Sequence, residues 1–173
     1  MKLKISHLSI GLHEFDFEEK VDSFEIEGKE RFPNPIRVHV KIDKEISNLI
    51  IKIHVCTLAH FTCDRCLDEF DREICEDTEL LYSTEQPAVE YGEYSEYNDS
   101  EIRPYSKDMD MIDISKDVRD TLLLAVPMKV LCRPDCKGLC PVCGANLNYQ
   151  TCHHEVEVVD PRWETLKGLL SGN

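Results

Sequence analysis

The segment from residue 132 to residue 154 concentrates residues that bind metal, with five cysteines and two histidines in 23 positions. A further Cys-x2-Cys pair, Cys63 and Cys66, lies upstream in the stretch TCDRCLDEF. Tetrahedral Zn²⁺ takes four soft donors, and such pairs let two thiolates reach one ion. The chain holds eight donors in four pairs, which predicts two closed, structural zinc sites. The predicted ligands are Cys63, Cys66, Cys132, Cys136, Cys140, Cys143, Cys152 and His154.

The spacing favours one way of combining the four pairs. The last four donors lie close together along the chain and can form one site locally, which leaves the first four for the other site. Only three residues separate Cys136 from Cys140, too few for the pairs that flank them to serve one ion without strain. A zinc ribbon, which would join the upstream pair to the pair at 140 and 143, stays open as an alternative. His153 is an alternative to His154, because spacing does not separate adjacent histidines.

Other chemistries fit these cysteines less well. The run CKGLCPVC has the C-x3-C-x2-C spacing of the iron–sulfur cradle in radical enzymes that use S-adenosylmethionine, but too little chain follows it for the barrel around such a cluster. A thioredoxin-like pair would need a βαβ unit, and the sequence shows none. A catalytic zinc would need an open position, and eight matched donors leave none. Structural zinc is therefore the prediction.

The remaining cysteines and histidines show no pattern of a site. Cys56 and Cys75 lie in strand-like runs, where we expect small, buried, apolar residues. The histidines at 13, 39, 54 and 60 are scattered and have no evident partners. The chain has no Gly-rich phosphate loop, G-x-S-x-G elbow or H-E-x-x-H helix. We therefore expect no enzymatic activity.

The composition and charge limit the class of protein. No apolar run reaches the roughly 20 residues of a membrane helix, and the start of the chain lacks the apolar region of a secretory signal. We therefore expect a cytoplasmic protein, in which clustered cysteines bind metal and disulfides are rare. The net charge of −14 predicts repulsion from bare nucleic acid unless positive charges cluster, and favours a basic protein partner.

The elements that position the cysteines follow from hydrophobic periodicity. Residues 35–42 and 48–63 alternate apolar and polar side chains, as half-buried strands do, and residues 71–83 are a third candidate strand. The gaps between them are too short for crossover helices, so we expect an antiparallel meander or a partly open barrel. Residues 113–127 predict a helix with Asp113 or Ser115 as its cap and Pro127 at its end. Residues 160–170 predict a second, short helix.

These elements predict an α+β fold in three parts. Residues 1–84 form a β-rich platform, and residues 114–173 form a helix plus a Cys-rich zinc module, knuckle-like or ribbon-like, packed on the platform. Residues 85–113, with nine acidic and two basic residues, lie between them. This acidic segment is either a partly disordered, solvated loop or a docking tail for a basic partner.

Several stretches, in this order along the chain, resemble the YceD-like family of large-ribosomal-subunit RNA accumulation proteins. They are FTCDRCLDEF, IDISKDVRDTLLLAVPMKVLCRPDCKGLCPVCGANLN and DPRWETLKGL. The resemblance runs from about residue 50 to residue 170. It implies a ribosome-biogenesis factor needed for accumulation of the large-subunit (23S) rRNA, and it carries over no catalytic residue. Where this family usually ends its last cluster with C-x-C, the chain has His154, a conservative change for zinc.

Three hypotheses about function remain. In the first, a non-catalytic, zinc-stabilised factor binds pre-ribosomal RNA or a ribosomal protein through exposed residues of its C-terminal part. The candidate contacts are Lys129, Arg133, Lys137, Arg162 and Trp163. In the second, a protein-only adaptor holds a basic ribosomal protein or an RNA-processing enzyme through the acidic segment. In the third, a small metallo-hydrolase acts on RNA, which would require an open metal position.

Overall fold

The computed structural model describes residues 1–84, 102–106 and 108–154. The chain divides into two compact units. Unit 1 consists of Met1–Phe61 and Glu69–Val130, and unit 2 consists of Thr62–Asp68 and the chain from Leu131 onward. The helix predicted at residues 113–127 lies in unit 1, and residues 62–68 of the predicted β-rich platform lie in unit 2.

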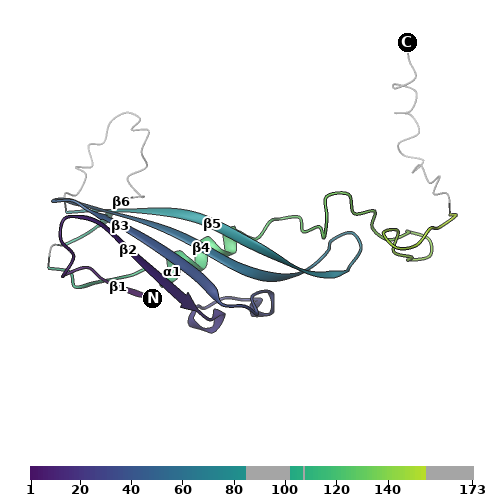
Figure 1. Ribbon diagram of the computed structural model, residues 1–173, viewed down its shortest axis with the longest axis horizontal. Helices are drawn as coiled ribbons and strands as arrows, with labels where there is room; N and C mark the ends of the chain where they lie inside the picture. Colours follow the sequence, from purple (N-terminus) through teal and green to yellow (C-terminus); the bar gives the residue numbers. More distant parts are fainter. Residues whose placement is uncertain (85–101, 107, 155–173) are drawn as a thin grey trace, which may run out of the picture. The chain divides into compact units, whose positions relative to one another are not determined.

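A five-stranded sheet forms the framework of unit 1 (Figure 1). Its strands, in spatial order, are β2 (Gly11–Glu19), β3 (Ile36–Lys44), β4 (Asn48–Thr62), β5 (Glu69–Ser83) and β6 (Ile102–Pro104). Strand β3 pairs antiparallel with both β2 and β4, and β6 runs parallel to β5. Two short strands, β1 (Lys2–Lys4) and β7 (Met111–Asp113), form a separate antiparallel pair. Two short 3-10 helices, Val21–Ser23 and Lys29–Arg31, lie between β2 and β3.

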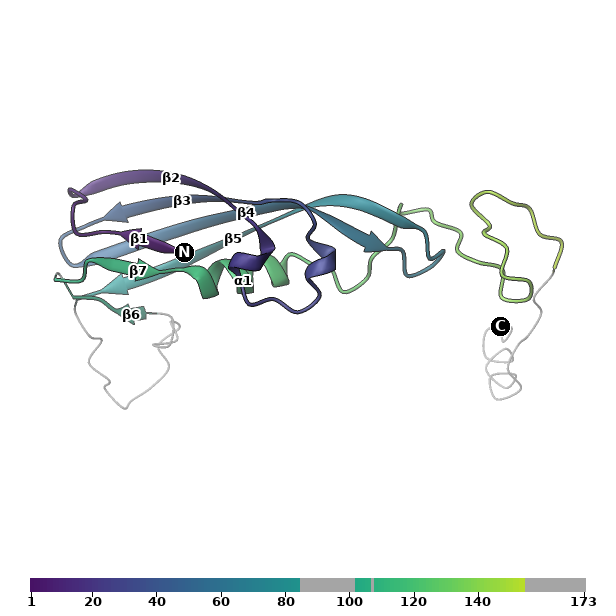
Figure 2. The same cartoon turned by 90° about the horizontal axis from the view of Figure 1, so that it is seen from below.

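One face of the sheet packs into the core. Helix α1 (Ser115–Leu124) and the β1–β7 pair lie on this side (Figure 2), and Val118, Leu122, Leu3 and Ile112 are buried in the same core. Strands β3 and β4 contribute every second side chain, because alternate side chains of a strand point to opposite faces. These buried residues are Ile36, Val38, Val40, Ile42, Leu49, Ile51, Ile53 and Val55.

Helix α1 begins and ends close to its predicted limits. The Asp113 carboxylate accepts hydrogen bonds from the Ser115 backbone N–H at 2.9 Å and from the Ser115 hydroxyl at 2.6 Å. These bonds, the one from the hydroxyl above all, lower the pKa of Asp113 to about 2. The N-cap position belongs to Ile114, which makes no side-chain capping bond, and Asp113, one residue earlier, satisfies the free N–H of Ser115 at the start of the helix.

The α+β class and the three predicted strands are confirmed, but the described residues form two open sheets and no barrel. In the acidic segment, residues 102–106 and 108–113 include β6 and β7. Arg103 of β6 forms two hydrogen bonds, at 3.0 and 2.5 Å, with the Asp117 carboxylate of α1. The predicted helix at 160–170 lies outside the described residues.

The opposite face of the sheet, which we call the open face, carries acidic side chains paired with lysines or histidines of neighbouring strands. The pairs are Glu14–Lys41, Lys52–Glu79, Asp16–His39, His54–Asp77 and Asp71–His60. The histidines that sequence reasoning left without partners thus have them, and His13 contacts the Ser9 carbonyl oxygen at 2.8 Å. Most of the partners lie on another strand, so only the register of the sheet reveals them.

Cys56 and Cys75 form a disulfide between β4 and β5. The prediction that both are buried, apolar residues is wrong, because Cys75 is exposed and the two are bonded. The expectation that cysteines of this chain do not form disulfides is also wrong for this pair. The β4–β5 hairpin brings the two residues together, although 19 positions separate them along the chain.

Candidate metal centres

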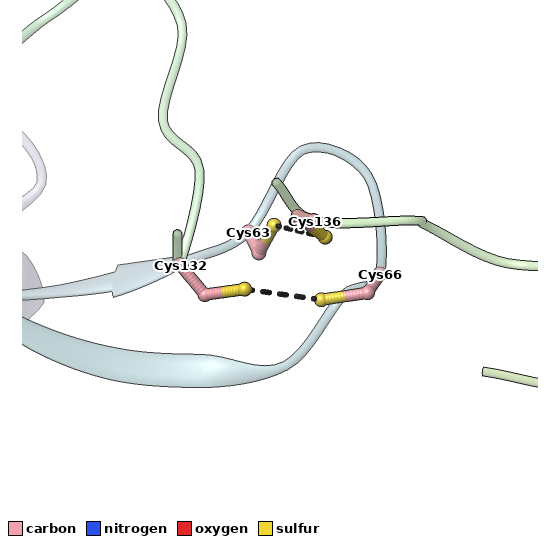
Figure 3. Close-up of side chains that lie close together, drawn as sticks. All are labelled: Cys63, Cys66, Cys132 and Cys136. Carbon is pink, nitrogen blue, oxygen red and sulfur yellow. Dashed lines mark hydrogen bonds between the residues drawn. The ribbon is translucent and has the colours of Figure 1, made fainter. Parts of the chain in front are cut away.

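Unit 2 brings four cysteine sulfurs together from two segments of the chain (Figure 3). Cys63 and Cys66 come from the turn after β4, and Cys132 and Cys136 from the chain after α1. Cys63 Sγ lies 3.8 Å from Cys136 Sγ, and Cys66 Sγ lies 3.6 Å from Cys132 Sγ. Zn–S bonds of about 2.3 Å in a tetrahedron place sulfurs about 3.8 Å apart. This first set could therefore hold one metal ion.

Backbone hydrogen bonds shape the turn after β4, which carries Cys63 and Cys66. The Leu67 N–H donates to the Cys63 carbonyl oxygen at 3.0 Å. The Cys63 N–H donates to the Asp68 carbonyl oxygen at 2.9 Å. Leu67 adopts φ 62°, which is uncommon for a residue with a side chain. Arg65 Nη1 donates to the Cys136 carbonyl oxygen at 2.9 Å, which ties the turn to the second segment.

Backbone N–H groups surround the Cys63 sulfur. Burial raises the pKa of this thiol, but N–H groups of Cys132, Cys66 and Arg65 outweigh burial and lower the pKa to about 6. Burial raises the pKa of the Cys66 thiol, and the Cys63 sulfur adds to this increase. Hydrogen bonds thus favour a thiolate at Cys63, and a thiolate among buried sulfurs attracts a cation.

Asn148 and Gly138 support Cys136 within the first set. Asn148 Nδ2 donates to Cys136 Sγ at 3.4 Å and lowers the pKa of this thiol, while Asn148 Oδ1 accepts the Lys137 N–H at 2.8 Å. Gly138 has φ 77°, and a Cβ at this position would lie 3.1 Å from the Arg65 carbonyl oxygen. A glycine is therefore required both for the backbone conformation and for the close approach to the first turn.

A second set consists of Cys140, Cys143, Cys152 and His154. Three cysteines and one histidine are a common ligand combination of structural zinc. Cys152 Sγ lies 3.3 Å from Cys140 Sγ and 3.6 Å from Cys143 Sγ, and His154 Nδ1 lies 2.8 Å from Cys152 Sγ. Cys143 and His154 are exposed, whereas three of the four cysteines in the first set are buried. This second set could also hold a metal ion.

In the second set, as in the first, backbone N–H groups lower the pKa of one cysteine. N–H groups of Cys143 and Val142 face the Cys140 sulfur and lower its pKa to about 6. The Gly144 N–H donates to the Cys140 carbonyl oxygen at 2.8 Å. Gly144 has φ 72° with open space around it, so the turn requires a glycine for its backbone conformation alone.

Side-chain and backbone hydrogen bonds of residues outside the two sets connect them. Asn146 Nδ2 lies 3.0 Å from both carboxylate oxygens of Asp68, the residue that ends the first turn. The Leu147 N–H donates to the Gly138 carbonyl oxygen at 2.9 Å. Sequence reasoning missed Asp68, Asn146 and Asn148, because no spacing rule singles out such supporting residues.

The structure brings all eight predicted donors together in two sets of four. The first four donors form one set and the last four form the other, which is the combination that spacing favours. The zinc-ribbon combination is not the one formed, and His154 takes the last position instead of His153.

Sequence reasoning missed a third group, which lies in unit 1 and comprises His54, Cys56 and Cys75. It joins side chains of two strands, so no short motif in the sequence contains it.

The structure describes three of the five predicted contact residues, all of them exposed: Lys129, Arg133 and Lys137. Arg133 lies 3.6 Å from the Asp135 carboxylate and donates to Asn148 Oδ1 at 2.8 Å. Its guanidinium is thus held beside the first set. Arg162 and Trp163 lie outside the described residues.

Comparison with known protein families gives a match for residues 51–170, to the family described as large ribosomal RNA subunit accumulation protein YceD. The match covers more than half of the chain and includes every donor of the two sets. The chain belongs to the YceD family. The resemblance of its cysteine segments to this family is therefore confirmed.

Individual relatives of this YceD-family chain come from plants and mycobacteria. A chloroplastic YCED homolog 1 of Arabidopsis thaliana, named as a large ribosomal RNA subunit accumulation protein, is 29% identical over 78% of this chain and 48% of its own length. A homolog of the same name from Zea mays is 57% identical over 21% of this chain and 13% of its own length. An uncharacterized protein of Mycobacterium tuberculosis is 42% identical over 34% of this chain and 28% of its own length.

The chain thus spans at most about half the length of these relatives. No solved structure matches it significantly. Among the described residues, no helix is long and apolar enough to cross a membrane.

Proposed function

We propose that this protein is a non-catalytic ribosome-biogenesis factor that supports accumulation of large-subunit (23S) rRNA in the cytoplasm. Membership of the YceD family, shown by the match over residues 51–170, carries this proposal. The matched region contains both candidate metal centres, so the proposed role belongs to the part of the chain that they organise.

Two structural zinc ions would stabilise unit 2. The donors fit this ion, because four cysteines, or three cysteines and one histidine, are both common combinations in structural zinc sites. Each set supplies four protein ligands, so neither leaves the open position that a catalytic zinc needs. Bound zinc would hold the coordinating cysteines as thiolates and connect segments that are distant in sequence. This supports a non-enzymatic role.

The bound molecule would be pre-ribosomal RNA, a ribosomal protein or both. Exposed Arg133 and Lys137 lie on either side of Cys136 in the sequence and could contact phosphates, as arginine and lysine side chains do in complexes with nucleic acid. A guanidinium held in place by Asn148 loses less side-chain entropy on binding than a free one would. Lys129 is a further candidate for such contacts, as are Arg162 and Trp163.

The charge of the chain favours a second candidate, a protein-only adaptor or chaperone for a basic ribosomal protein or a processing enzyme. The net charge is −14, and residues 85–101 carry six acidic residues and no basic one. A segment of this charge attracts basic proteins and repels RNA.

Gradient sedimentation of the tagged chain with ribosomal particles from its own host, with and without RNase, tests both candidates. We expect it to migrate with immature large subunits. An RNA binder leaves the particles after RNase treatment, and its binding weakens steeply with salt.

A matched variant with the six acidic residues of 85–101 changed to Asn and Gln separates the candidates. It spares β6, which begins at Ile102. The adaptor loses its partner in this variant, whereas the RNA binder does not. A chain that stays at the top of the gradient at low salt contradicts stable binding to particles.

A further inference from the structure

The third group of donors lies on the open face of the sheet in unit 1. Cys56 of β4 and Cys75 of β5 form the disulfide, and His54 Nε2 lies 3.1 Å from Cys56 Sγ. The imidazole nitrogen and the two sulfurs all lie within 4.8 Å of one another. Two soft sulfurs and one imidazole are the donor types that Zn²⁺ prefers.

The other side of the His54 ring is already oriented. His54 Nδ1 lies 2.7 Å from Asp77 Oδ1, and a carboxylate only accepts, so Nδ1–H donates to it. In the neutral imidazole this leaves Nε2, which faces Cys56 Sγ, with the lone pair. This carboxylate–histidine arrangement fixes the tautomer of zinc-binding histidines in metalloproteins. Asp77 therefore has the position of a residue that prepares His54 to bind a metal.

The surroundings give a metal ion access. Asp16, Arg37, His39, His54 and Cys56 are among the residues that line a surface cavity of about 570 Å³. Three protein donors leave a fourth tetrahedral position, and this cavity has room for a water molecule or another ligand there. The site thus differs from the two sets of unit 2, in which all four donors come from the protein.

We propose that His54, Cys56 and Cys75 form a redox-controlled site for Zn²⁺. A dithiol reductant breaks the Cys56–Cys75 bond, supplying two electrons and two protons and becoming a disulfide itself. Zn²⁺ then displaces the two thiol protons into solvent and binds two thiolates and His54 Nε2. A disulfide oxidant takes two electrons from the thiolates, re-forms the bond, becomes a dithiol with two protons from solvent, and releases Zn²⁺. In a reducing compartment the metal-binding form is favoured, since disulfides there are reduced.

Cobalt titration of the full-length chain tests this proposal. The two sets of unit 2 are first loaded with Zn²⁺, and Co²⁺ is then added to the oxidised form, to the dithiol-reduced form and to a reduced Cys56→Ala/Cys75→Ala variant. Thiolate-to-cobalt charge-transfer absorption reports binding. We expect one additional equivalent of Co²⁺ in the reduced wild type only. Equal binding by the reduced wild type and the double variant overturns the proposal, and so does equal binding by both redox forms of the wild type.

A matched pair of histidine variants tests the imidazole donor. His60 also lies on β4 with its Nδ1 2.7 Å from an aspartate, Asp71, but it does not belong to the third group. We expect His54→Ala to weaken Co²⁺ binding by the reduced chain at least tenfold and His60→Ala to leave it unchanged. An unchanged affinity in His54→Ala contradicts the proposed donor set. The comparison of the two redox forms of the wild type does not depend on any variant folding.

Discussion

Asn148 shows how single residues determine the chemistry of the cysteine module. Its amide nitrogen contacts Cys136 Sγ, and its amide oxygen accepts from the Lys137 backbone and the Arg133 side chain. One side chain therefore orients a metal donor and restrains a candidate RNA contact. Such outer contacts of metal ligands influence both affinity and orientation.

A substitution at Cys143 tests whether the second set binds metal. Cys143→Ser removes one of four donors, so we expect bound zinc to fall from two ions per chain to one in the form that keeps the Cys56–Cys75 disulfide. In small zinc modules metal binding supplies about 10 kcal/mol of folding free energy, so this part of unit 2 should also become sensitive to protease. Metal analysis and limited proteolysis measure these effects.

His153→Ala is the control for this variant, because His153 is adjacent to the set without belonging to it. With the Cys56–Cys75 disulfide intact, it should keep two zinc ions. If Cys143→Ser keeps its full zinc content and protease resistance, the assignment of the second set is wrong.

At the scale of elements, the start of helix α1 depends on Asp113. Asp113→Ala removes the acceptor for the Ser115 N–H, and we expect the free energy of unfolding to fall by about 1 kcal/mol. The lowered pKa of Asp113, about 2, sets the pH dependence. Its carboxylate stabilises the fold above the unfolded-state pKa of about 4, and this contribution is lost as the pH falls from there through about 2.

Urea unfolding of wild type and variant across this pH range checks the prediction. Asp110→Ala is the control, because Asp110 is an exposed acidic residue near the start of β7. A difference between Asp113→Ala and wild type that persists unchanged below pH 2 would rule out the carboxylate as its source.

The elements with strong periodicity could be predicted from the sequence. The runs that became β3 and β4 alternate apolar and polar side chains, and the predicted helix has Asp113 before its start and Pro127 after its end. The strands β1, β6 and β7 have only three residues each, and so short a run shows no period. β6 pairs with the long strand β5, and β1 and β7 pair with each other, so all three depend on tertiary contacts that no local pattern in the sequence reveals.

The same distinction applies to the candidate sites. The donors of unit 2 could be predicted because short turns fix their spacing, and such turns leave a motif in the sequence. The group formed by His54, Cys56 and Cys75 depends on the register between β4 and β5. A shift of one residue in this register would place the side chains of the two strands on opposite faces, and the sequence does not give the register. Sequence reasoning therefore could not tell that the two cysteines meet, and it assigned both to the core.

At the scale of the whole molecule, the most acidic segment and the candidate metal centres of unit 2 lie in different parts of the sequence. Six acidic residues without a basic one occupy 85–101, whereas residues 127–170 carry five acidic and five basic residues. The region that contains the candidate metal centres is thus less repulsive to RNA than the chain as a whole. An acidic segment and a near-neutral segment that contains two candidate metal centres would suit a factor that contacts both a basic protein and RNA.

The central claim is that this YceD-family chain supports accumulation of large-subunit rRNA. The most direct measurement is the ratio of large-subunit to small-subunit rRNA in host cells depleted of the chain, with and without re-expression. We predict that the ratio falls on depletion and that the wild-type chain restores it. A ratio that stays unchanged while the chain is demonstrably absent would contradict the account.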